Sequence, residues 1–68
     1  GVCMSEITLK RNGNLEEFHL TAKIDYSMLR FVLEAKAKRK TEVVELMIQR
    51  IDEAKKYLDK MKDDLKEI

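Results

Sequence analysis

The chain has 68 residues, 40% charged and 44% apolar, with a net charge of +1, a mixture that suits a folded, charged domain rather than a disordered tail. A single cysteine and a single histidine, Cys3 and His19, exclude a disulfide framework and the usual four-ligand zinc site. Because a lone chain of this length buries only about 60% of its unfolded surface, we predict an obligate homodimer.

The N-terminal residues carry no targeting pattern. Gly1 to Met4 lack the charged and apolar regions of a signal peptide, and no apolar run anywhere approaches the length of a transmembrane helix. We therefore expect a cytoplasmic protein without a membrane partner, in which Cys3 is reduced. Two interpretations of residues 1–3 stay open, a natural N-terminus or residues left from cloning ahead of a natural Met4.

Residues 7–24 alternate between apolar and polar side chains, and Asn12-Gly13-Asn14 supplies a turn signal between the two halves. With Gly13-Asn14 as the turn, Leu9 pairs with Phe18, and Lys10 pairs with the oppositely charged Glu17, whereas a turn one residue earlier gives worse pairs. The pattern predicts a β-hairpin; the alternative is a flexible N-terminal arm.

Residues 25–35 fit a first helix, which Asp25 or Ser27 can cap. Its apolar stripe consists of Met28, Leu29, Val32, Leu33 and Ala35. The stripe lapses at Lys36–Lys40, where four of five residues are cationic, so we expect a basic turn there. Because no glycine or proline intervenes, a single helix from Asp25 to Ile68 is the alternative.

A long C-terminal helix is predicted from Thr41, its N-cap, to Ile68. Its apolar residues follow an uninterrupted 3-4 spacing, typical of a coiled coil: Val44, Met47, Ile51, Ala54, Leu58, Met61, Leu65 and Ile68. Such a helix spans roughly 42 Å, more than a monomer of this size can cover. Arg50 would face Lys55 of a parallel partner, so we do not expect a parallel coiled coil along the whole helix.

The sequence gives no pattern for catalysis. It has no glycine loop that could cradle a phosphate, no nucleophile with a base and an orienting group, and no second ligand for a metal at His19. The carboxylates of the C-terminal half fit a solvated helix face. We predict that the protein is not an enzyme and needs no cofactor.

The order of strand, helix, basic turn and helix resembles the ribbon-helix-helix family of DNA-binding proteins. The residues that carry the likeness are the strand Phe18–Ile24, Asp25 after it, and the stretch Lys38–Ile51, which looks like the second helix of VapB-type antitoxins. The resemblance implies a mainly α fold with a short β element, a ribbon-helix-helix-like dimer. The N-terminal β-hairpin or arm and the long C-terminal helix that we expect are extra to the minimal family pattern. One departure is that Lys40 stands where the family usually has a turn glycine.

The function that this resemblance implies is a dimeric, sequence-specific regulator of transcription, such as an antitoxin or a plasmid- or virus-type repressor. A β-ribbon paired across the dimer would enter the major groove of double-stranded DNA. The implied base-reading residues are His19, Thr21 and Lys23, and the implied phosphate-binding residues are Lys38, Arg39, Lys40, Thr41 and Glu42. The implied dimer core consists of Leu20, Ala22, Ile24, Leu29, Val32, Leu33, Val44, Leu46, Met47 and Ile51.

An interaction module without DNA binding is the alternative function, and acidic residues beside the reading strand, Glu6, Glu16 and Glu17, favour it. A distal seam on the last helix is made of Leu58, Met61, Leu65 and Ile68. In the DNA-binding reading, Ala54 to Ile68 form an arm that binds a partner such as a toxin or extends the dimer, and in the alternative reading the seam binds another protein. The chain is predicted to be one domain, with an arm or first strand at 1–17, a core at 18–53 and a helical extension at 54–68.

Overall fold

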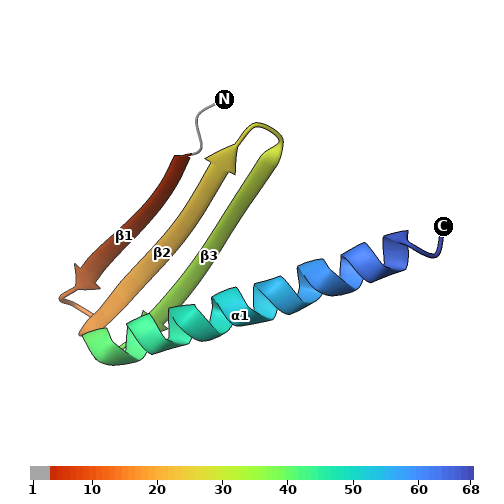
Figure 1. Cartoon of the computed structure of the whole chain (residues 1–68). Helices are drawn as coiled ribbons and strands as arrows, with labels where there is room; N and C mark the ends of the chain where they lie inside the picture. The colour runs from red at the N-terminus through yellow and green to blue at the C-terminus, as the bar shows by residue number, and fades with distance from the viewer. Residues whose placement is uncertain (1–3) are drawn as a thin grey trace.

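The computed structural model describes residues 4–68, so the expectations for Cys3 and for the origin of residues 1–3 lie outside it. Three antiparallel strands form one sheet in the order β1-β2-β3, and a single helix follows (Figure 1). The elements are β1 (Met4–Asn12), β2 (Glu17–Tyr26), β3 (Leu29–Ala37) and α1 (Lys40–Leu65). The prediction of a mainly α, ribbon-helix-helix fold is therefore wrong.

The predicted N-terminal hairpin is present, but its register differs by two residues from the expected one. Leu9 pairs with Leu20 rather than with Phe18, and four residues, 13–16, form the turn. The wider turn is stabilised by Asn12, whose Oδ1 accepts hydrogen bonds from the backbone N–H of Asn14 at 3.1 Å and of Leu15 at 3.4 Å. Because the shift is an even number of residues, every side chain stays on its expected face of the sheet.

Residues 29–37 form strand β3, not the predicted first helix. Leu29, Phe31, Leu33 and Ala35 alternate with polar residues, as expected of a strand with one buried face. Val32 interrupts this alternation on the polar face, and together with its apolar neighbours it produced the false helical stripe. The helix caps predicted before it are also wrong, since Asp25 lies in β2 and Ser27 lies in the β2–β3 turn with a positive φ of 52°.

Strand β2 is hydrogen-bonded to β1 on one edge and to β3 on the other. Both edges of β2 are therefore occupied within one chain, and no edge is left to pair with the same strand of a second copy. This arrangement rules out the symmetric ribbon that the ribbon-helix-helix fold requires.

The long C-terminal helix is confirmed as α1, with ends that differ slightly from the prediction. It begins at Lys40 and ends at Leu65, so the alternative of one helix from residue 25 onward is wrong. The N-cap is Arg39, in an extended conformation and without a side-chain hydrogen bond to the helix, and not Thr41. Thr41 lies within the first turn, where the helix is held by a backbone hydrogen bond of 3.0 Å from Val43 N–H to the Arg39 carbonyl.

The core lies where α1 crosses the apolar face of the sheet near the β1–β2 turn. Its buried members are Leu20, Ala35, Val43 and Met47, with Phe18, Ala22, Leu33, Ala37 and Leu46 packed around them. Helix α1 contacts β3 and β2 but not β1 in the described residues. Of the residues assigned from sequence to a dimer core, Ile24, Leu29, Val32, Val44 and Ile51 are exposed in the single chain.

The N-cap residue Arg39 makes no side-chain hydrogen bond to the helix, and this gives a testable prediction. Arg39→Ser should raise the free energy of unfolding by about 1 kcal/mol, because a serine hydroxyl at the N-cap can accept a hydrogen bond from the helix N-terminus. Glu42 stands three residues later and would complete a capping box. Urea titration followed by circular dichroism measures the change, with Thr41→Ser as the control that should alter stability by less than about 0.5 kcal/mol. A gain at position 41 instead would mean that the helix begins later.

Candidate functional site

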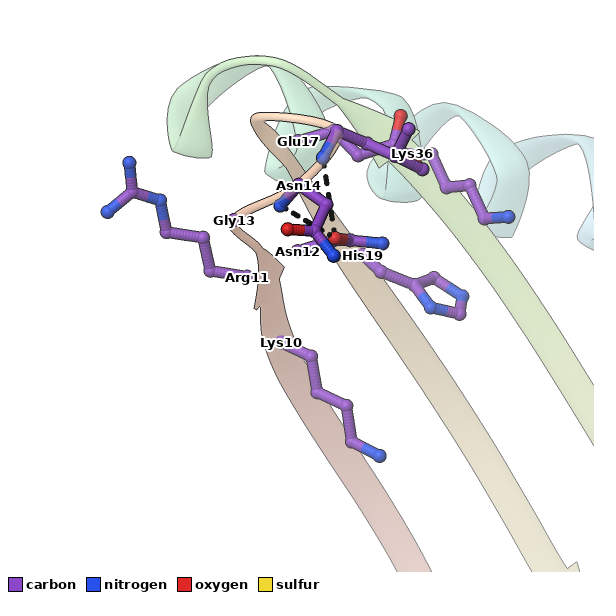
Figure 2. A pocket seen from close by; sticks show the side chains of 9 residues that line it. Lys10, Arg11, Asn12, Gly13, Asn14, Glu17, His19 and Lys36 are labelled. Atoms are coloured by element: carbon purple, nitrogen blue, oxygen red, sulfur yellow. Dashed lines mark hydrogen bonds between the residues drawn. The ribbon is translucent and has the colours of Figure 1, made fainter.

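The polar face of the sheet is open, because α1 covers the opposite face. Three basic residues, one on each strand, lie side by side on this face and form what we call the basic row. Lys10 on β1 pairs with His19 on β2, and His19 pairs with Lys36 on β3. Figure 2 shows these side chains on the same side of the sheet, with Arg11 pointing to the other side. The alternation of strand residues produces this row, since positions opposite one another in register share a face.

The row borders a shallow hollow of about 450 Å³ at the β1–β2 turn. Besides the three basic residues, the turn residues Asn12 to Leu15 line it, with Arg11 at its edge, and Glu17 is the one carboxylate in its lining. The space is open to solvent, and polar side chains line it together with Gly13 and the apolar Leu15. Such a hollow suits a solvated anion better than an apolar ligand.

His19 has a carboxylate beside it. Its Nε2 lies 3.5 Å from Oε1 of Glu34, yet within residues 4–68 this nitrogen has no hydrogen-bond partner and is shielded from solvent. This separation lies within the range of an ion pair but is too long for a good hydrogen bond, and both side chains are partly exposed, so the contact is weak. His19 therefore retains a free hydrogen-bonding atom, although a ligand can reach it only after a side-chain movement.

The two lysines of the row differ from His19. Throughout the described chain, no carboxylate forms a salt bridge with either Lys10 or Lys36. Both residues are exposed, so their ammonium groups can contact an anion without first breaking an ion pair. Sequence reasoning did not include Lys10 and Lys36 among the DNA-contacting residues, because it assigned Lys36 to a turn and Lys10 to a hairpin pair with Glu17.

The residues assigned to base reading, His19, Thr21 and Lys23, do share the polar face of β2. They lie on the middle strand of three rather than on a ribbon shared by two chains. Thr21 is flanked by Thr8 and Glu34, and Lys23 is flanked by Glu6 and Val32. Only the row through His19 is therefore basic across the full width of the sheet.

The residues assigned to phosphate binding follow the C-terminal end of β3. Lys38 and Arg39 form the connection to α1, Lys40 opens the helix, and Thr41 and Glu42 lie in its first turn; all are exposed. They share one end of the molecule with the row, because Lys36 lies on the same strand two residues before Lys38. The Glu42 carboxylate lies 3.9 Å from Arg39 Nε and weakens the positive potential of the connection.

A second feature lies on the other face of the molecule. Toward its C-terminus, helix α1 diverges from the sheet (Figure 1). An apolar groove lies between residues 51–58 of α1 and the sheet. Its two adjoining hollows measure about 320 and 360 Å³. The groove is lined mainly by Ile7, Ile24, Leu29, Phe31 and Leu33 from the sheet and by Ile51, Ala54, Leu58 and Met61 from α1.

The described residues bring together no group of three His, Cys, Asp or Glu side chains that could hold a metal ion. In the same part of the chain, no helix is long and apolar enough to cross a membrane.

Comparisons with protein-family models, with curated proteins and with solved structures gave no significant match for this chain.

Proposed function

We propose that the chain binds double-stranded DNA through the polar face of its sheet, at the end that carries the basic row. The observation that supports the proposal most directly is the row of Lys10, His19 and Lys36 across all three strands. Basic residues 38–40 extend the positive region at the same end. Phosphate contacts from such lysines supply most of the affinity of a non-specific DNA complex.

The width of the sheet fits this role. Neighbouring strands lie about 4.8 Å apart, so the two outer strands are separated by roughly 10 Å, close to the 12 Å width of the major groove. Lys10 and Lys36 on the outer strands would contact phosphates on the two sides of the groove. His19, Thr21 and Lys23 on the middle strand would then face base edges.

Carboxylates on the same face limit the affinity. Glu6, Glu17, Asp25 and Glu34 share the polar face with the lysines, and Asp25 is 3.5 Å from Arg30 in an ion pair. With few unpaired cations, we expect weak binding whose affinity falls as the ionic strength rises.

The test is a fluorescence-anisotropy titration of a labelled 20-base-pair duplex at 50 mM and 200 mM salt. Lys10→Ala combined with Lys36→Ala should weaken binding at 50 mM salt by about tenfold and reduce the slope of log affinity against log salt by about 2. Lys60→Ala together with Lys56→Ala, on the exposed surface of α1, is the matched control and should change binding by less than twofold. Absence of wild-type binding at 50 mM salt would overturn the proposal.

The second candidate function is the interaction module without DNA binding, and the apolar groove favours it. Such a module would self-associate and would show no duplex binding at any salt concentration. In this case the double lysine variant should match the wild type in both self-association and stability.

A further inference from the structure

The chain exposes far more surface than a compact monomer of its mass. Its accessible surface is 6204 Å², whereas a compact protein of 8.0 kDa exposes roughly 4,450 Å². The radius of gyration is 14.9 Å, compared with about 11 Å expected for 68 residues. The excess of roughly 1,750 Å² is larger than the roughly 800 Å² that each partner buries in a standard protein interface.

Much of this excess is apolar and lies in one place. On the sheet side of the groove, Ile7 is 77% exposed and Leu29 is 48% exposed. On the helix side, Leu58 is 47% exposed and Met61 is 59% exposed, and Leu65 continues the stripe beyond the sheet. An apolar patch of this extent marks an interaction surface on a soluble protein.

We propose that this groove is filled by a second copy of the chain, whose α1 packs antiparallel against this α1 and covers the exposed end of the sheet. Within residues 4–68, the apolar stripe of α1 is the element that matches the groove in length and character. Under a two-fold axis each copy supplies one helix and one groove, so the contact is self-complementary and closes as a dimer. The proposal does not depend on DNA binding, because the groove and the basic row lie on opposite faces of the sheet.

Charge decides the direction of the two helices. In a parallel pair, Arg50 would lie beside the partner's Lys55, a repulsive contact made twice. In an antiparallel pair with Ala54 opposite the partner's Leu58, Arg50 and the partner's Asp64 face each other at positions that flank the seam, an attractive contact made twice. On the other flank Lys55 faces its own copy once, so the attractive contacts outnumber the repulsive one. In this antiparallel register, the partner's Met61 and Leu65 lie in the groove beside Ile51.

Sedimentation equilibrium between 1 and 200 μM tests the proposal. The wild-type chain should sediment as a dimer, with twice the 8.0 kDa mass of one copy. Leu58→Asp should raise the dissociation constant by about a hundredfold or more, because it places a charge in the apolar contact. Lys60→Asp, a charge change on the exposed side of the same helix, should leave the dimer intact. A monomeric wild type at 200 μM would overturn the proposal.

If Leu58→Asp unfolds the chain, exchanging charges at the exposed positions Arg50 and Asp64 still tests the dimer. Arg50→Asp and Asp64→Arg should each weaken the dimer several-fold, and the double variant should restore it, because the exchange rebuilds the attractive pair with reversed signs. A dimer that none of the groove or charge variants alters would overturn the proposal and place the contact elsewhere, such as the free edge of β1.

Discussion

Leu20→Ala should lower the free energy of unfolding by about 2–4 kcal/mol, the largest loss that we expect from any single truncation. Leu20 is 6% exposed on the middle strand, where it lies between Leu9 and Ala35 in the sheet and faces α1. Small single-core domains have only about 3–5 kcal/mol of stability. A substantial unfolded population is therefore expected at room temperature, visible as reduced ellipticity and a low urea midpoint.

The matched control is Leu15→Ala. Leu15 lies in the β1–β2 turn and is 63% exposed, so the same truncation should cost less than about 0.5 kcal/mol. Equal losses at the two positions would contradict the placement of the core. Since self-association adds to apparent stability, the titrations should be compared at one protein concentration.

The sequence predicted the N-terminal hairpin and the C-terminal helix because each has a long, regular pattern. The alternation of residues 18–24 placed His19, Thr21 and Lys23 on one face, and the structure agrees with that placement. The register was missed because the Asn12 side chain supports a four-residue turn, which a two-residue turn rule does not anticipate. Positive φ at Glu16, rather than at Gly13, also separates this turn from the expected one.

Residues 25–37 were predicted wrongly because two periodicities coexist there. Val32 creates a helical spacing with its apolar neighbours, while Phe31, Leu33 and Ala35 alternate as in a strand. Tertiary packing favours the strand over the helix, because residues 29–37 form hydrogen bonds with β2 as strand β3 and bury Ala35 under α1. The false helix, placed between a strand and a true helix, was what made the chain resemble a ribbon-helix-helix protein.

The basic row could not be predicted without the correct third strand. Lys10 and Lys36 are 26 positions apart in sequence, and the pairing of both with His19 depends on two registers at once. The apolar groove was partly anticipated, because the heptad spacing indicated an unpaired helix stripe. The sequence could not show that the exposed end of a sheet would form the other wall of that groove.

Two neighbouring valines test the orientation of α1 with the same chemical change. Val43 is fully buried against the sheet, whereas Val44 is 41% exposed. The heptad pattern assigned Val44 to the apolar seam, but the structure turns Val43 toward Ala35 and Leu20 in the core. Val43→Ala should therefore lower the free energy of unfolding by about 2 kcal/mol, through lost burial and the cavity left behind.

Val44→Ala should change the free energy of unfolding by less than about 1 kcal/mol, since part of the side chain already contacts water. Urea titrations of both variants, at one protein concentration, measure the difference. In the antiparallel dimer Val44 lies near the outer end of the paired helices, so its truncation should also leave the dissociation constant within about threefold of the wild type. The reverse order of stability would mean that α1 is rotated about its axis, because a helix with Val44 against the sheet would expose Val43.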